Sequence, residues 1–168
     1  MQSNLKVVHI STYDLYGGAS IAMYRLHKGL LSHGIDSSIF CRQKSGYDTQ
    51  VTRLDKPGFY EKIGLKWANR KINRARNKYS PPPGFEKFSV DISPYREIIK
   101  RQLPTADIYH IHWTADFTDI PYLLKYIDKP VVWTLHDMWP FTGGCHYSGS
   151  CQNYKEKCGS CPQLASGN

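Results

Sequence analysis

Two hydrophobic periods follow one another in the first forty residues. Residues 5–11 form a largely apolar, β-branched run, typical of a strand buried on both faces of a parallel sheet. Residues 19–33 then follow a helical period, which Gly34 ends. The apolar positions of that helix are Ala22, Met23, Leu26 and Leu30. A second strand is predicted at 37–41, so the order of elements predicts a right-handed βαβ unit.

The same order of elements returns near the carboxyl end. Residues 107–113 and 130–136 are apolar runs of strand length, and residues 120–127 between them have room for two helical turns. We therefore predict an α/β fold with a Rossmann-like, doubly wound and mainly parallel sheet. The chain of 168 residues has the size of one domain. We expect it to occupy residues 1–140, with a small cysteine-rich appendage at 141–168.

The middle of the chain carries a basic helical segment at 59–79, which a proline run ends at 81–84. Its basic residues are Lys62, Lys66, Arg70, Lys71, Arg74, Arg76 and Lys78. Phe59, Ile63 and Trp67 follow one another at four-residue spacing. Two interpretations stay open: this apolar row packs on the domain beneath a solvated basic face, or it inserts into an anionic membrane surface.

The overall charge narrows the choice of partners. The chain has 22 basic and 14 acidic residues and a net charge of +8, which favours an anionic partner. No stretch approaches the roughly 20 apolar residues of a membrane span, and the amino end lacks the pattern of a signal peptide. We expect a cytoplasmic protein, whose cysteines are thiols or metal ligands rather than disulfides.

Two glycines stand where the first strand passes into the first helix. Gly17 and Gly18 allow positive φ and a close approach of the backbone to a ligand. The N–H groups of Gly18, Ala19 and Ser20 begin the helix, so the turn predicts a phosphate or carboxylate site. The alternative is that the glycines serve turn geometry alone. The G-x-G-x-x-G fingerprint is absent, which argues against a nicotinamide-dependent dehydrogenase.

Histidine, tryptophan and aspartate side chains follow the two later strands. They are His112 and Trp113 after one strand, and His136, Asp137 and Trp139 after the next. Because the carboxyl ends of parallel strands meet at one edge, we expect both groups to converge on the glycine turn. His136 is the better candidate for catalysis because an acid follows it, although Asp137 also suits the cap of the next turn. We interpret His110, within its strand, as structural.

Four cysteines gather near the carboxyl end with the spacing C-x₅-C-x₆-C-x₂-C. They are Cys145, Cys151, Cys158 and Cys161. The last pair is typical of a zinc knuckle, so four thiolates predict a structural zinc site, with His146 as a substitute ligand. Disulfides and buried free thiols are the alternatives. Cys41, far from this cluster, is expected in the core.

Three stretches of the chain together resemble one enzyme family. HISTYDLYGGASIAMYRL (9–26), DIYHIHW (107–113) and TLHDMWPFTGGCHY (134–147) with the spaced cysteines are similar to the amino-terminal domain of family 4 glycosyltransferases, especially polysaccharide-building members. The resemblance is weak over 42–104. It implies a GT-B fold, in which two Rossmann-like domains face a cleft. It also implies transfer of a sugar from a nucleotide-sugar to a glycan or lipid-linked acceptor, with retention and without a catalytic metal.

The resemblance further implies a role for each matching residue. Those expected at the donor phosphate are Gly17, Gly18, Ala19 and Ser20. Those expected beside the transferred sugar are His136 and Asp137. Those expected on the acceptor side are Asp14, Tyr16, His112, Trp113 and Trp139. The basic segment fits peripheral docking on the inner face of a membrane, through Lys66, Trp67, Arg70 and Arg74.

The chain departs from this family in length. A complete member would have two domains and roughly twice this length, and the acidic E-x₇-E-type motif of the second domain has no counterpart. We expect the C-terminal nucleotide-sugar domain in cis or in trans, and no turnover from this chain alone. A non-catalytic accessory half is one alternative. A basic, zinc-stapled nucleic-acid module is the other, but no nucleic-acid motif is present, so we expect no nucleic-acid partner.

Overall fold

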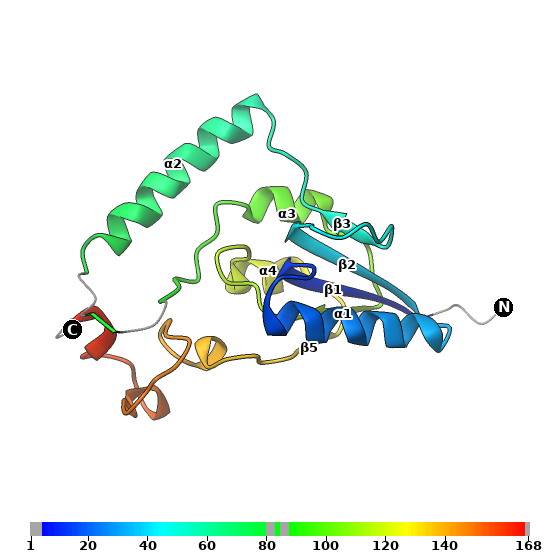
Figure 1. Ribbon diagram of the computed structural model, residues 1–168. Coiled ribbons are helices and arrows are strands. Elements are labelled where there is room, and N and C mark those ends of the chain that lie inside the picture. Colours follow the sequence, from blue (N-terminus) through cyan, green and yellow to red (C-terminus); the bar gives the residue numbers. More distant parts are fainter. Residues whose placement is uncertain (1–4, 80–82, 85–87, 167–168) are drawn as a thin grey trace.

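The computed structural model describes residues 5–79, 83–84 and 88–166. Their strands form one five-stranded sheet in the order β3-β2-β1-β4-β5, and every neighbouring pair is parallel (Figure 1). The strands are β1 (Lys6–Tyr13), β2 (Asp36–Gln43), β3 (Val51–Arg53), β4 (Ile108–Ile111) and β5 (Val131–Trp133). This confirms the predicted α/β, Rossmann-like sheet.

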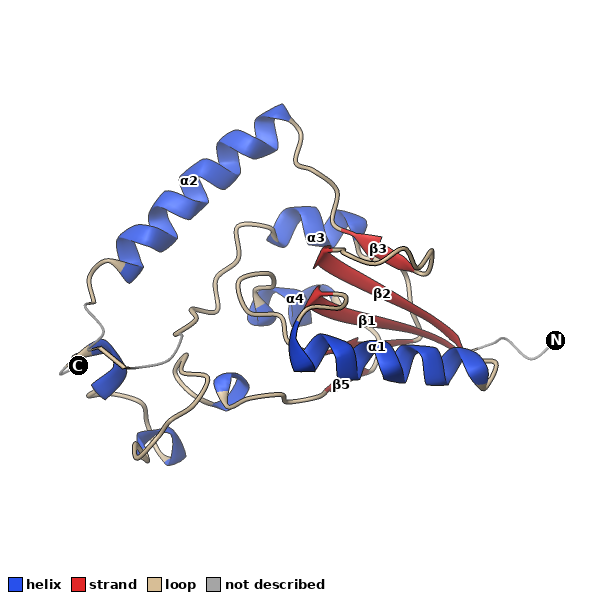
Figure 2. Ribbon diagram, viewed as in Figure 1, coloured by secondary structure: helices blue, strands red, loops and turns tan. Residues whose placement is uncertain are grey.

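Helices lie on both faces of the sheet, as a doubly wound fold requires (Figure 2). They are α1 (Gly17–Ser32), α2 (Phe59–Arg76), α3 (Arg96–Gln102) and α4 (Ile120–Tyr126), with short 3₁₀ turns at Trp139–Phe141, Asn153–Lys155 and Pro162–Leu164. Helices α3 and α4 share the larger core cluster with Val8, Ile10 and Phe40 of the sheet. On the other face, Met23 of α1 packs with Ile39 and Cys41.

The buried side of α1 differs from the predicted one. Met23 is buried as expected, but Ala22 and Leu26 are exposed. The buried positions are Ser20, Met23 and His27. His27 can be buried because its Nδ1 lies 2.8 Å from the hydroxyl of Ser37 in β2. This polar contact turns the side of α1 that carries His27 toward the sheet. Gly34 ends the helix at a φ of +76°, as predicted.

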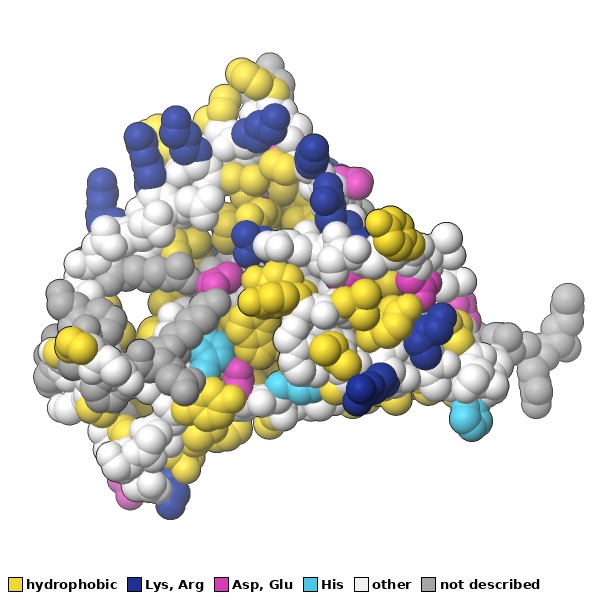
Figure 3. Space-filling model, viewed as in Figure 1, with side chains coloured by type: hydrophobic (Ala, Val, Ile, Leu, Met, Phe, Trp, Pro, Cys, Tyr) yellow, Lys and Arg dark blue, Asp and Glu magenta, His cyan; other side chains and the backbone are white. Residues whose placement is uncertain are grey.

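Helix α2 does not pack on the domain through Phe59, Ile63 and Trp67, but through other side chains. Those three side chains are 74%, 46% and 67% exposed, so the interpretation that they pack inward is wrong. Ile72 is buried and Leu65 packs against the main core instead. Lys and Arg side chains project from the outer side of α2 (Figure 3). Of the predicted stop at 81–84, residues 81–82 lie outside the described residues. The side chain of Arg76 lies outside them as well.

Strand β5 is the exposed edge of the sheet. The apolar run at 130–136 forms the predicted strand, but Val131, Val132 and Leu135 are 36%, 48% and 50% exposed. Among the described residues no strand pairs with its outer edge, which leaves the backbone groups of that edge unpaired in the sheet. None of the described helices is long and apolar enough to cross a membrane.

Candidate functional site

A cavity of about 520 Å³ opens beyond the carboxyl ends of β1, β4 and β5. Its lining residues are Tyr13, Tyr16, Gly17, Gly18, Ala19, Ser20, Trp113, His136, Asp137 and Tyr147. The glycine turn and the ends of the two later strands therefore converge, as the sequence predicts. Tyr13 and Tyr147 are lining residues that sequence reasoning missed. Tyr13 could have been found as an aromatic residue at the end of a strand that leads into the turn.

The glycine turn places an open helix terminus in this cavity. Gly17 has a φ of +81°, whereas Gly18 has helical backbone geometry. The cap residue Tyr16 makes no side-chain hydrogen bond to the first turn, and that turn contains no acidic residue. A Cβ atom added at Gly18 would have no heavy atom of the described residues within 4 Å, apart from its own chain neighbours and the backbone of α1. The terminus thus offers uncapped N–H groups and room for an anion.

His136 lies beside that terminus as a neutral imidazole. Burial lowers the pKa of His136, and nearby Asp137 opposes this shift only in part. Its Nε2 atom lies 3.1 Å from Nδ1 of His112, so the ring is held from behind. A neutral, oriented imidazole can donate or accept one hydrogen bond in the cavity without bringing a charge.

The Asp137 carboxylate holds the walls of the cavity in place. Its Oδ2 accepts hydrogen bonds from Nε1 of Trp113 at 2.8 Å and from Nδ1 of His146 at 2.6 Å. Its Oδ1 accepts the backbone N–H of Trp139 at 3.0 Å, at the start of the following 3₁₀ turn, whose cap residue is Met138. His146 also meets Ser89 through Nε2 at 2.9 Å. Both ring nitrogens of His146 therefore have hydrogen-bond partners, Asp137 and Ser89, so neither is directed at the cysteines as a substitute zinc ligand.

Aromatic rings form one side of the cavity. The rings of Tyr13 and Trp113 are nearly parallel, with an interplanar angle of 16° and centroids 6.2 Å apart. Tyr16 meets Tyr13 edge to face at 5.1 Å. Rigid aromatic faces next to a few polar groups suit a ligand with an apolar face and hydroxyl groups.

Three residues expected on the acceptor side do not line this cavity. His112 is buried behind His136, and Trp139 is buried in the main core cluster. Asp14 is also buried, and its carboxylate accepts hydrogen bonds from Leu15, Ser45 and Gly46. Burial alone would raise the pKa of Asp14, but the hydrogen bonds from these residues outweigh burial and lower the pKa. Asp14 therefore holds the loop after β2 in place through these hydrogen bonds.

We expect Asp14→Asn to lower the free energy of unfolding by about 2 kcal/mol at pH 7, because an amide cannot accept all of these bonds. Since the folded pKa of Asp14 lies below the unfolded one, its contribution is present above the unfolded value, 3.8, and is lost as the pH falls through the folded pKa. Urea unfolding of both proteins at pH 7 and pH 3 measures this. A difference that does not shrink at pH 3 would contradict the account.

The cysteine-rich appendage carries four thiols that form no disulfide. All five cysteines are free, and Cys41 is buried in the core as expected, where burial raises its pKa to about 12. Burial also raises the pKa of Cys145, and the nearby thiols of Cys161 and Cys158 add to the effect. Among the described residues, no three of the four clustered thiols lie within metal-binding distance of one another. Zinc binding by the cysteines stays a prediction.

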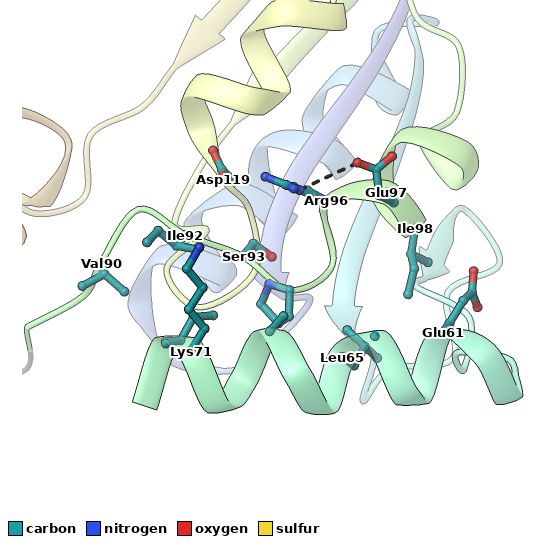
Figure 4. Close-up of a pocket in the computed structure, with 14 residues that line it drawn as sticks. Glu61, Leu65, Lys71, Val90, Ile92, Ser93, Arg96, Glu97, Ile98 and Asp119 are labelled. Atoms are coloured by element: carbon teal, nitrogen blue, oxygen red, sulfur yellow. Dashed lines mark ion pairs between the residues drawn. The ribbon is translucent and has the colours of Figure 1, made fainter. Parts of the chain in front are cut away.

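A second cavity, of about 580 Å³, lies between α2 and the segment that leads into α3 (Figure 4). Leu65 and Ile72 of α2 face Val90, Ile92 and Ile98 across it. Its charged lining residues are Glu61, Lys71, Arg96, Glu97 and Asp119. An ion pair of 2.6 Å between Arg101 and Glu61 ties α3 to the start of α2. This cavity is mainly apolar with a charged rim.

Comparison with known proteins assigns the family. The family model of Glycosyltransferase Family 4 matches residues 16–157. The chain is 46% identical over 157 residues to a protein of Escherichia coli (strain K12) named "Putative colanic acid biosynthesis glycosyl transferase WcaC". That match covers 88% of this chain and 37% of the relative, so the chain spans just over a third of the relative's length. No solved structure matches. Because the family model covers residues 16–157, well over half of the chain and every lining residue except Tyr13, the chain belongs to glycosyltransferase family 4.

Proposed function

We propose that this chain is the amino-terminal, acceptor-side part of a glycosyltransferase that transfers a sugar from a nucleotide-sugar to a glycan or lipid-linked acceptor, with retention, in polysaccharide biosynthesis. The observation that carries the proposal is the cavity in which an uncapped helix terminus meets a neutral imidazole and an aromatic wall. The printed name of the Escherichia coli relative supports the polysaccharide context.

The helix terminus is assigned to the donor diphosphate. The N–H groups of Gly18, Ala19 and Ser20 carry the positive end of the α1 dipole into the cavity. A diphosphate leaving group gains negative charge as the sugar departs, so fixed N–H donors stabilise the transition state more than the ground state. The C-terminal domain would hold the nucleoside.

His136 is assigned to the transferred sugar. Its ring borders the cavity together with the glycine turn, and His112 fixes its orientation. A neutral imidazole suits hydrogen bonding to a sugar hydroxyl, because the ring nitrogen that does not face His112 can donate or accept one hydrogen bond. The Trp113 ring, held by Asp137, offers the sugar a flat apolar face.

The acceptor side is assigned to the region of α2. The mainly apolar cavity beneath this helix suits a lipid-linked acceptor, and the exposed row of Phe59, Ile63 and Trp67 lies on the same helix. The guanidinium of Arg70 lies 5.8 Å from the centre of the Trp67 ring. Basic and aromatic side chains presented together support peripheral docking on the anionic inner face of a membrane.

Vesicle binding tests this docking. We expect the chain to sediment with phosphatidylcholine vesicles that contain phosphatidylglycerol, and less so as salt rises. Replacing Lys66 and Arg70 by alanine should weaken binding by about 2 kcal/mol, or roughly 30-fold. Trp67→Ala should also weaken it, whereas Tyr47→Ala, at a loop residue that is 99% exposed, should not. Equal binding by all four proteins would contradict membrane docking by α2.

Transfer itself is tested with a full-length protein that contains this domain. Labelled nucleotide-sugars are incubated with the enzyme and a membrane extract, and the label is followed into lipid and glycan fractions. We expect transfer from one donor class, with the anomeric configuration of the product unchanged. Absence of transfer from every nucleotide-sugar, together with salt-sensitive binding of nucleic acid, would favour the nucleic-acid alternative.

A further inference from the structure

Three histidines meet on the sheet face that carries α1. His9 of β1 is the direct register partner of His110 of β4, and His112 follows two residues later on the same face. The ring centroids are 5.1 Å apart for His9 and His110, 5.3 Å for His9 and His112, and 4.1 Å for His110 and His112. Parallel pairing of β1 with β4 therefore builds a compact group of imidazoles.

All three rings are buried and neutral. Their exposed fractions are 0%, 9% and 3% for His9, His110 and His112. Burial, followed by the charges of neighbouring histidines, lowers the pKa of His9 to about 3 and that of His112 to about 2, and it also lowers the pKa of His110. Neutral imidazole is the form that binds metal, so no proton has to leave at neutral pH.

The outward nitrogens of two of these rings already have partners. Nδ1 of His112 lies 3.1 Å from Nε2 of His136, and Nε2 of His110 lies 2.7 Å from the hydroxyl of Thr134. Metal-binding histidines are oriented by such bonds from the nitrogen that does not bind the metal. This leaves Nε2 of His112 and Nδ1 of His110 to turn toward His9.

The separations between the ring nitrogens fit one ion. Nδ1 of His9 and Nε2 of His112 are 3.1 Å apart, close to the about 3.3 Å between two nitrogens on one tetrahedral zinc. One nitrogen from each of the three rings lies within 4.8 Å of the others, and among the described residues this is the one such group of His, Cys, Asp or Glu. Nε2 of His9 is buried without a hydrogen-bond partner among the described residues. This is the other ring nitrogen from the one that faces His112, so the ion site rests on the three convergent nitrogens and not on the unsatisfied atom.

We propose that His9, His110 and His112 bind one divalent transition-metal ion, in the first place zinc, as a structural clamp between β1 and β4. Three imidazole nitrogens select zinc, cobalt or nickel over magnesium and calcium, which prefer oxygen ligands. The ion would draw the rings together by side-chain rotation and join two strands that are 101 residues apart in register. The clamp lies behind His136, whose ring meets Nδ1 of His112.

Cobalt binding tests the clamp in the absence of thiolate ligands. In a chain whose Cys145, Cys151, Cys158 and Cys161 are serine, we expect one Co²⁺ per chain with the visible absorption of nitrogen coordination, displaced by Zn²⁺. His9→Gln and His110→Gln, which keep similar volume and polarity, should each lose this absorption. His33→Gln, at an exposed histidine, should keep it. Circular dichroism and the melting temperature of each variant show that it is folded.

Two results would overturn the clamp. One is a folded serine background that binds no Co²⁺, which would leave the imidazoles as a hydrogen-bonded chain only. The other is absorption that survives both glutamine variants. Should the serine background fail to fold, X-ray absorption of the wild-type chain with two equivalents of Zn²⁺ decides instead. A fit that requires a histidine shell supports the clamp, and a fit by sulfur alone rejects it.

Discussion

Replacing His136 by alanine in the full-length enzyme should lower kcat by about 10²–10³-fold, the usual cost of one oriented hydrogen bond in a transition state. The same change should lower the free energy of unfolding by only about 1 kcal/mol, because the half-buried ring makes one hydrogen bond within the described part of the chain, to His112. Transfer rates at saturating donor and urea unfolding measure the two effects on the same preparations.

The matched control is His33→Ala, which removes an exposed histidine at the end of α1. We expect it to change neither kcat nor stability appreciably. If His136→Ala instead lost activity only in proportion to its loss of folded protein, the ring would be structural and its assignment to the sugar would fail.

Gly18→Val should raise the dissociation constant of the donor diphosphate at least about tenfold, equivalent to 1.4 kcal/mol. The side chain would project from the first turn of α1 into the cavity where the phosphate is expected. Folding should tolerate it, because Gly18 has helical backbone geometry and an added Cβ meets nothing within 4 Å. Gly17 is unsuitable for this test, since its φ of +81° would strain any other residue.

Gly29→Val supplies a matched control in the same helix, where an added Cβ also meets nothing within 4 Å. Trp113 lines the cavity, so its fluorescence reports binding of inorganic pyrophosphate to the chain and of nucleotide-sugar to the full-length enzyme. We expect the signal to respond in the wild type and in Gly29→Val but not in Gly18→Val. Unchanged affinity in Gly18→Val would contradict the assignment of the donor diphosphate to the helix terminus.

Local periodicity was enough to predict the elements that position the cavity. The apolar run at 5–11, the helix that follows and the two later strands all exist, and their ends converge as a parallel sheet requires. The glycine pair and His136 could be placed because each follows the end of a strand within five residues. Such positions depend on chain order and sheet topology, both of which are visible in the sequence.

What the sequence could not show depends on contacts between distant segments. The buried face of α1 is decided by His27 meeting Ser37, which no helical period reveals. Asp14 resembled a ligand-binding residue by position, yet its carboxylate is used by a loop about thirty residues later. His110 looked structural when taken alone, and only the register of β1 with β4 brings it to His9 and His112.

The strand order has a consequence for folding during synthesis. Strand β1 pairs with β2 within the first βαβ unit, but its other edge waits for β4, whose register partners lie 101 residues later. At a translation rate of about 5–20 residues per second, that edge and His9 remain uncovered for about 5–20 s. A long-range parallel pairing of this kind also slows folding. The nascent chain therefore passes through a stage in which β1, an inner strand of the final sheet, has one unpaired edge. During that stage chaperones or other nascent chains compete with β4 for this edge.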